Sequence, residues 1–152
     1  MKKITPFLWF DGQAEEAMNF YVSVFKNSKV LGLTPGPNGI AQSVSFELDG
    51  QEFIGLNAGP NFKFNEAISF LVDCKTQEEV NELWEKLSAD GGEESMCGWL
   101  KDKYGLSWQI IPSALSEMLG DRDPEKANRV MQAMLKMQKI VIADLQKAYD
   151  GE

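Results

Sequence analysis

Two periods of apolar and polar positions follow one another along the chain. A short apolar run over residues 4–10 predicts a buried strand. From Gln13 to Phe25 the apolar residues fall at helical spacing, which predicts an amphipathic helix. Alternation and turn signals then predict further strands over residues 29–34, 42–48 and 53–57. The pattern indicates a unit of one strand, one helix and three strands.

The same order begins again after the loop at residues 59–65. Residues 67–72 predict a strand and residues 76–87 a helix. Paired strands then follow, with turns at Gly91-Gly92 and at residues 103–105. The two helices match at a spacing of 63 residues, Ala14-Glu15-Glu16-Ala17 against Gln77-Glu78-Glu79-Val80. We therefore expect two modules of one kind, over residues 1–60 and 61–112.

The last strand, residues 106–111, carries one polar side chain among apolar neighbours. A period of two places Ser107, Gln109 and Ile111 on one face, and Leu106, Trp108 and Ile110 on the other. Gln109 then points either into a pocket or out to water.

Residues 113–152 contain helix formers and predict a helical extension. Ser113 is expected to start a short helix that Gly120 ends. Asp123-Pro124-Glu125 is a typical helix start, and the helix is expected to run to Tyr149. Its apolar stripe, which we expect to cover the sheet or a partner subunit, consists of Val130, Met134, Met137, Val141 and Leu145.

Composition limits the class of protein. The chain has 152 residues and 43% hydrophobic residues, which is enough for the core of one domain over residues 1–152. The formal charge of −8 disfavours nucleic acid and anionic membranes, since both require a basic face. No apolar run reaches the roughly 20 residues that a bilayer requires, and the two cysteines form no CxxC pair. We expect a cytoplasmic protein.

The chain contains no histidine, the commonest general base and metal ligand. Catalysis would have to use carboxylates, Lys, Tyr or Cys, and the sequence identifies no catalytic residue. The loop at residues 36–39 also lacks the glycine pattern of a phosphate or S-adenosylmethionine site.

Several segments resemble the PhnB-like branch, often labelled "3-demethylubiquinone-9 3-methyltransferase", of the vicinal oxygen chelate superfamily. That superfamily includes glyoxalase I, bleomycin-resistance proteins and extradiol dioxygenases. The similar segments are Pro6–Phe10, Phe46–Phe53, Asn57–Pro60, Phe64–Phe70, Cys97–Asp102 and Asp123–Met137. The resemblance implies an α+β fold of two βαβββ modules with a C-terminal helical extension. It also implies a homodimer with a ligand in a concave sheet.

Enzymes of that superfamily hold a divalent metal with His or Glu from the first and last strands of each module. The matching positions here are Pro6, Asn57, Ala67 and Gln109. Proline and alanine cannot ligate through their side chains, and amides are weak sole anchors. The resemblance therefore implies a family member without the usual metal site, and we expect no cofactor.

The leading hypothesis is a small-molecule binding protein or a diverged enzyme. Aromatic side chains could wall an apolar ligand and the polar ones could orient it, although strand aromatics are usually core and Glu47 could simply be solvated. The candidate pocket residues are Trp9, Glu47, Asn57, Phe64, Ser69, Trp99, Trp108 and Gln109.

Two alternatives remain open. One is a metal-dependent lyase, dioxygenase or resistance transferase that uses Glu47, Glu52 or Glu66. The other is an interaction module that binds a partner protein through the Met-rich C-terminal helix, whose apolar stripe would then be exposed.

Overall fold

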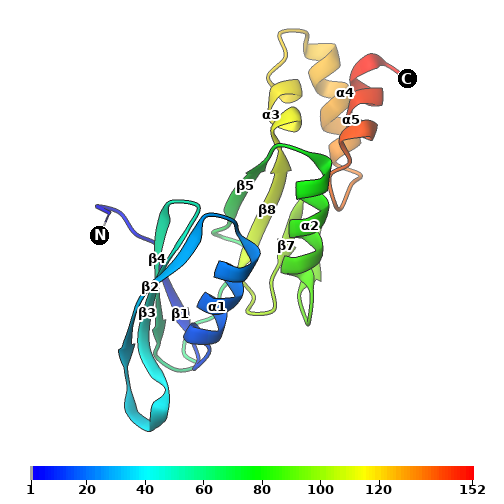
Figure 1. Cartoon of the computed structure of the whole chain (residues 1–152). Helices are drawn as coiled ribbons and strands as arrows, with labels where there is room; N and C mark the ends of the chain where they lie inside the picture. Colours follow the sequence, from blue (N-terminus) through cyan, green and yellow to red (C-terminus); the bar gives the residue numbers. More distant parts are fainter. Residues whose placement is uncertain (1) are drawn as a thin grey trace. The chain divides into compact units, whose positions relative to one another are not determined.

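The computed structural model describes residues 2–152 (Figure 1). The chain forms two compact units, a first that ends at Phe64 and a second over Asn65–Glu152. The boundary falls in the loop predicted to separate the two modules.

The first unit has the predicted order of one strand, one helix and three strands. Its elements are β1 (Phe7–Phe10), α1 (Ala14–Val24), β2 (Ser28–Pro35), the short 3-10 turn η1 (Pro37–Gly39), β3 (Ala41–Leu48) and β4 (Gln51–Asn57). The sheet order is β1-β4-β3-β2, with β1 parallel to β4 and the other neighbours antiparallel.

Helix α1 packs on one face of this sheet. It buries Ala14, Ala17, Met18 and Tyr21. The Tyr21 ring lies 6.1 Å from the ring of Phe46, which stacks on Phe53 at 5.4 Å. Phe46 has no exposed surface, and burial of such a side chain contributes about 1.5–3 kcal/mol. This aromatic stack joins the helix to the two central strands.

The first strand is shorter than predicted. β1 begins at Phe7, and Ile4 is 84% exposed. Pro6 lies just before the strand and contributes only its carbonyl, which accepts from Ile54 N at 3.0 Å, because proline has no N–H to donate. The apolar run at residues 4–10 is therefore only partly strand.

The second unit repeats the module, although its first strand lies at residues 70–74 and not at 67–72 as predicted. Its elements are β5 (Phe70–Cys74), α2 (Gln77–Ser88), β6 (Glu93–Glu94), β7 (Trp99–Lys101) and β8 (Ser107–Pro112). The sheet order is β5-β8-β7-β6, and β5 runs parallel to β8 as β1 does to β4. Thr76 caps α2 by accepting from Glu79 N at 3.2 Å. The predicted repeat and α+β class are confirmed.

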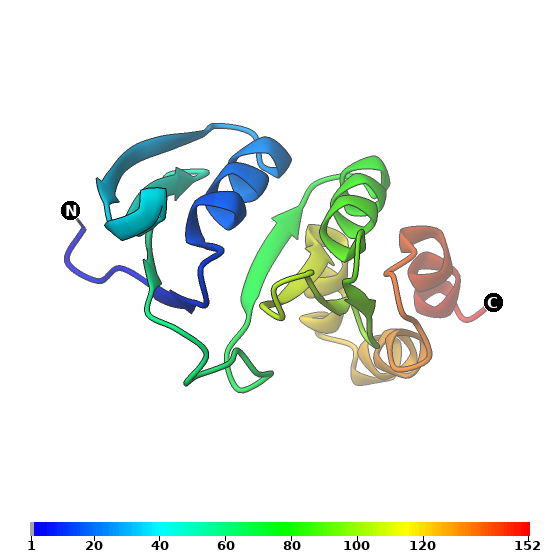
Figure 2. The same ribbon diagram turned by 90° about the horizontal axis from the view of Figure 1, so that it is seen from below.

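Helix α2 lies along one face of this second sheet (Figure 2). It buries Val80, Leu83, Trp84 and Leu87. From the strands, Leu100 and Trp108 are opposite neighbours on β7 and β8 and are at most 2% exposed. The other face of the sheet is the side that carries Gln109.

The extension contains three helices, so the prediction of one helix from Asp123 to Tyr149 is wrong. The helices are α3 (Ser113–Leu119), α4 (Pro124–Met134) and α5 (Ile142–Asp150). Asp123 caps α4 as predicted, by accepting from Glu125 N at 2.9 Å.

Long-range hydrogen bonds account for the break between α4 and α5. The carbonyls of Met137 and Gln138 accept from Cys97 N at 2.7 Å and Gly98 N at 2.8 Å. The Gln77 side chain accepts from Ile142 N at 2.7 Å and donates to Ile140 O at 2.9 Å. These contacts fix residues 135–141 as a connection against the sheet, although that segment contains no Gly or Pro to signal it.

The predicted apolar stripe is buried in part. Its members Val130 and Leu145 have no exposed surface and pack with Ile140, whereas Met134, Met137 and Val141 are half-buried. The interaction-module alternative required this stripe to be exposed, and two of its five side chains are fully buried. Along the described residues 2–152, no helix combines the length and apolar character needed to span a membrane.

Substitution of Ile140 tests this packing. Ile140→Ala should lower the free energy of unfolding by about 2–4 kcal/mol, because it leaves a cavity in the cluster. The matched control is Ile4→Ala, which removes the same atoms from a side chain that is 84% exposed. Urea unfolding followed by circular dichroism measures both, and equal midpoints would contradict the packing.

Candidate functional site

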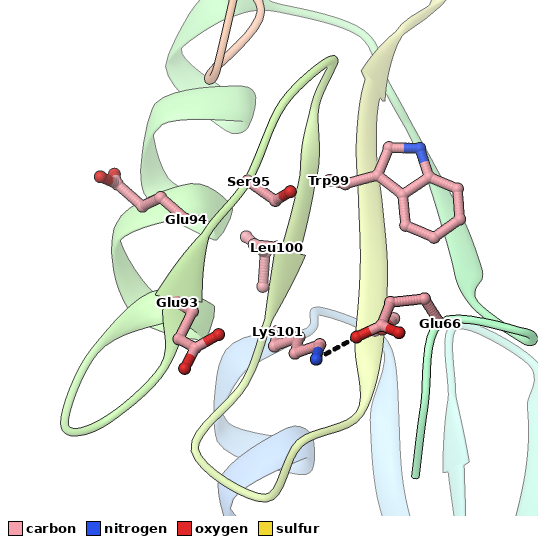
Figure 3. Close-up of a pocket in the computed structure, with 8 residues that line it drawn as sticks. Glu66, Glu93, Glu94, Ser95, Trp99, Leu100 and Lys101 are labelled. Atoms are coloured by element: carbon pink, nitrogen blue, oxygen red, sulfur yellow. Dashed lines mark ion pairs between the residues drawn. The ribbon is translucent and has the colours of Figure 1, made fainter.

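The candidate site is the face of the second sheet that points away from α2. Opposite neighbours on adjacent strands share a face, so the register aligns Leu71, Gln109 and Trp99 in one row. Leu71 is 59% exposed, whereas Gln109 and Trp99 are half-buried. Figure 3 shows Trp99 on the side of the strands opposite the helix. We call this the open face.

A hydrogen bond fixes the polar group of that row. Gln109 Nε2 donates to Ser69 Oγ at 2.9 Å. The amide oxygen Oε1 stays available as an acceptor beside Trp99. The structure thus brings together three of the predicted pocket residues, Ser69, Trp99 and Gln109.

A pocket of about 340 Å³ adjoins the row. It is lined by Glu66, Glu93, Glu94, Ser95, Trp99, Leu100, Lys101 and Ser107 (Figure 3). Glu94 accepts a hydrogen bond from Trp84 Nε1, which turns its carboxylate away from Lys101. The charged groups left near Lys101 are the carboxylates of Glu66 and Glu93.

Lys101 and Glu66 form an ion pair in this pocket (Figure 3). The hydrogen bond from Lys101 holds the pKa of Glu66 below its ordinary value, and the same bond raises the pKa of Lys101. Both groups stay charged at neutral pH. The Glu66 side chain is 60% exposed and the Lys101 side chain 33%, so solvent screens the attraction.

Ser107 contributes a hydroxyl without a protein partner. Its residue is 1% exposed, and its Oγ makes no hydrogen bond to any part of residues 2–152. A buried polar group left unsatisfied costs about 1–3 kcal/mol, so such groups are rare in native proteins. Ser107 lines the pocket that contains Lys101.

A buried carboxylate shapes the turn between β7 and β8. Asp102 is 2% exposed and accepts from Tyr104 N at 2.9 Å, Leu106 N at 3.1 Å and Trp108 Nε1 at 2.9 Å. The predicted pocket residue Trp108 therefore lies in the core on the α2 side, opposite to Gln109. The role of Asp102 was missed, although an aspartate that begins a turn is a sequence signal for this kind of bond.

Two candidates of the first unit pack against other aromatic rings. Trp9 donates from Nε1 to Gly59 O at 2.9 Å and meets Phe62 edge-on at 4.9 Å. Phe64 meets the buried ring of Phe10 edge-on at 5.4 Å. These contacts order the loop after β4.

Asn57 uses its amide within the fold. Its Oδ1 accepts from Ala14 N at 3.0 Å, at the start of α1, and its Nδ2 donates to Ala41 O at 2.8 Å. Asn57 thus supplies a hydrogen bond that the α1 N-terminus requires, although Gln13 occupies the cap position.

The alternative carboxylate ligands are Glu47 and Glu52 in the first unit and Glu66 in the second. Glu47 lies half-buried between Lys29 and Glu52 in the register of β2, β3 and β4, whereas Glu66 pairs with Lys101. In the described part of the chain, no group of three or more Cys, Asp or Glu side chains lies close enough to hold a metal ion.

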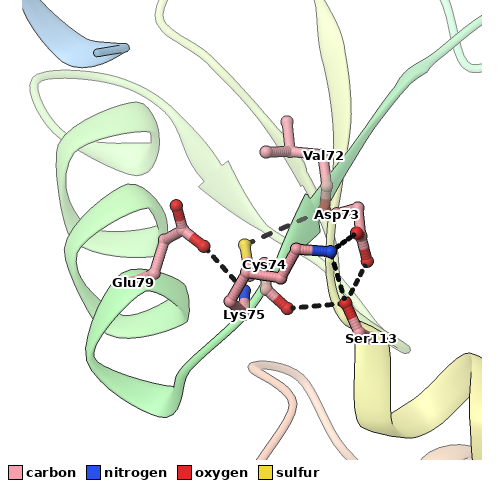
Figure 4. Close-up of polar contacts among 6 residues, drawn as sticks. All are labelled: Val72, Asp73, Cys74, Lys75, Glu79 and Ser113. Carbon is pink, nitrogen blue, oxygen red and sulfur yellow. Dashed lines mark hydrogen bonds and ion pairs between the residues drawn. The ribbon is translucent and has the colours of Figure 1, made fainter.

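A second polar network joins the end of β5 to the start of α3 (Figure 4). Ser113 Oγ donates to Asp73 Oδ1 at 2.7 Å, and Lys75 Nζ pairs with Asp73 Oδ2 at 2.7 Å. The bond from Lys75, followed by that from Ser113, holds the pKa of Asp73 below its usual value. Next to it, burial raises the pKa of the Cys74 thiol to about 12. We interpret the network as structural, because its groups satisfy one another.

Comparison with known proteins gives a consistent result. A family profile described as 3-demethylubiquinone-9 3-methyltransferase matches residues 2–111. Among solved structures, a PhnB protein from Bacillus cereus with the same family description is 38% identical, with a TM-score of 0.69. The match covers 73% of this chain and 99% of that one. No curated protein matches the chain.

More distant structures share the fold. A protein from Pseudomonas aeruginosa is 16% identical with a TM-score of 0.62, over 74% of this chain and 98% of that one. The fosfomycin resistance protein FosX from Listeria monocytogenes is 15% identical with a TM-score of 0.60, over 79% of this chain and 98% of that one.

The carboxylate of Asp102 can be tested by removing its charge alone. Asp102→Asn places an amide donor against either Trp108 Nε1 or the backbone N–H groups, so we expect a loss of about 2–4 kcal/mol in unfolding free energy. The control is Asp11→Asn at an exposed bend, expected to change stability by about 0.5 kcal/mol or less. If urea unfolding gives Asp102→Asn a loss of stability no larger than that of Asp11→Asn, the carboxylate does not hold the turn.

The two thiols should react differently. Cys74 has no exposed surface and a raised pKa, whereas Cys97 is half-buried. Iodoacetamide at pH 8 should label Cys97 in the folded protein and reach Cys74 only after unfolding, because the thiolate is the reactive form. Peptide mass spectrometry reads both sites, and labelling of Cys74 at the rate of Cys97 would contradict the burial.

Proposed function

The chain belongs to the 3-demethylubiquinone-9 3-methyltransferase family, in the PhnB-like branch of the vicinal oxygen chelate superfamily, and on that premise we propose that it binds a small organic molecule on the open face. The contact groups proposed are the indole of Trp99, the amide of Gln109 and the side chain of Leu71. Of the candidate pocket residues, Ser69 acts by orienting Gln109.

The orientation of Gln109 carries this proposal. Ser69 accepts a hydrogen bond from the Gln109 amide nitrogen, which fixes the Gln109 side chain. Its amide oxygen then lies between two apolar neighbours, Leu71 and Trp99. Ligand sites combine apolar walls with a few placed polar groups in this manner. A small molecule with an apolar part and a hydrogen-bond donor fits these groups.

We propose that binding here does not depend on a metal. Two of the positions matched to metal ligands are Pro6 and Ala67, which offer no donor side chain. At the other two, Asn57 Oδ1 accepts from Ala14 N, and Gln109 is oriented by Ser69. This donor set does not fit a divalent ion.

The family description does not lead us to propose methyl transfer. Gly36 and Gly39 lie in the connection between the antiparallel strands β2 and β3. A nucleotide-type glycine loop instead joins a strand to the N-terminus of a helix.

A homodimer and a cytoplasmic location complete the proposal. Large apolar side chains remain exposed on the single chain, including Phe7 at 59%, Phe62 at 66% and Ile68 at 63%. Burial of these groups by a second copy would remove apolar surface from water and so favour a dimer. Native mass spectrometry of the purified protein, with elemental analysis, reports subunit count, bound metal and any retained small molecule together.

The ligand face is tested with a probe panel of phenols, indoles and aromatic acids and amines. We expect at least one class to bind the wild type and raise its melting temperature. Gln109→Leu should weaken the affinity for that class by about tenfold, the effect of one lost hydrogen bond of about 1.4 kcal/mol. The control is Gln51→Leu, at an exposed position of β4. If no class binds and no molecule is retained, the proposal is wrong.

A further inference from the structure

Three polar side chains lie in one row across the strands of the candidate site. Glu93 is opposite Lys101 on β6 and β7, and Lys101 is opposite Ser107 on β7 and β8. Opposite residues have Cβ atoms about 5 Å apart on the same face. The ammonium of Lys101 and the hydroxyl of Ser107 are therefore neighbouring donors on paired strands.

The Ser107 hydroxyl requires an acceptor that the described chain does not provide. It is buried, lines the pocket, and makes no hydrogen bond within residues 2–152. Lys101 has a carboxylate partner in the same pocket, but that carboxylate makes no bond to Ser107. An acceptor placed between the two donors would satisfy both.

Glu66, which lies on a loop, takes the acceptor position beside Lys101. Residues 58–69, which join β4 to β5, contain no helix or strand, and the Glu66 side chain is 60% exposed. Because water already reaches the carboxylate and screens the pair, its release into solvent carries little penalty. Lys101, by contrast, is held by strand pairing on both sides.

Charge balance decides which ligand group fits. Glu66 and Glu93 are the two carboxylates that favour the charged form of Lys101. If a ligand anion replaces Glu66, the local net charge does not change. A ligand cation at the same place would instead meet the ammonium of Lys101.

We propose that the ligand carries an oxyanion, bound by Lys101 Nζ and Ser107 Oγ in place of the Glu66 carboxylate. The organic part then lies against Trp99, two residues before Lys101 on the same face of β7. This inference rests on the proposed function and names the chemical class of its ligand. Glu66 acts as an internal competitor that leaves when the anion arrives.

Three probes of one shape test the charge requirement. Benzoate, benzyl alcohol and benzylamine are titrated into the wild type by calorimetry, and benzoate is expected to bind most tightly. Glu66→Gln should raise the affinity for benzoate by about two- to fivefold, because benzoate then no longer competes with an exposed ion pair. Lys101→Met should weaken benzoate by about tenfold, as for one charge-assisted bond.

Matched controls separate this effect from folding. Glu82→Gln and Lys86→Met break an exposed ion pair of α2 and should leave benzoate affinity unchanged. Ser107→Ala should weaken benzoate without lowering the melting temperature, because the hydroxyl has no protein partner to lose.

Each result has a defined meaning. Unchanged or weaker benzoate binding by Glu66→Gln, or preference for benzylamine, overturns the inference. Equal binding of all three probes, insensitive to Lys101→Met, also overturns it but leaves the proposed function intact. If none of the three binds to the wild type or to Glu66→Gln, the inference is wrong, and the wider panel decides the proposed function.

Discussion

The carboxylate of Asp102 is the constraint on which the candidate site depends. A buried charge is tolerated only where hydrogen bonds replace water, and here two backbone N–H groups and an indole N–H do so. The backbone bonds shape the turn that joins β7 to β8, and the indole bond ties the start of β8 to that turn. Since Lys101 precedes Asp102 and Ser107 lies just after the turn, the same carboxylate sets the two donors side by side.

Repetition of one module gives the chain two sheets with different uses for the same kind of residue. In the first unit the amide of Asn57 supplies a hydrogen bond to the start of α1, and the aromatic residues after β4 pack on one another. In the second unit the amide of Gln109 is held by a loop serine and keeps an oxygen free on the open face. A polar residue near the end of a module can therefore complete the fold or offer a contact, and its neighbours decide which.

Local periodicity was enough to predict the two modules, because each strand and helix buries one face within its own unit. The break at residues 135–141 could not be predicted in this way. It depends on carbonyls bound by Cys97 and Gly98, about forty residues earlier in the chain. The Ser69, Trp99 and Gln109 grouping followed from strand faces and the resemblance, whereas the Lys101 and Ser107 pair needed the register across β7 and β8. Trp108 was predicted for the pocket because its size suggested a wall, but alternation had already placed it opposite Gln109.

The same hairpin contains two buried polar side chains, one with hydrogen-bond partners and one without. Asp102 accepts hydrogen bonds from donors within the chain, and these offset the cost of removing its carboxylate from water. Ser107, five residues later, is buried to the same degree but has no partner. No hydrogen bond in the folded chain offsets the cost of removing its hydroxyl from water. Alanine in its place would avoid that cost without changing the strand. We therefore infer that the partner of the Ser107 hydroxyl arrives from outside the chain, and the lysine beside it favours a negatively charged one.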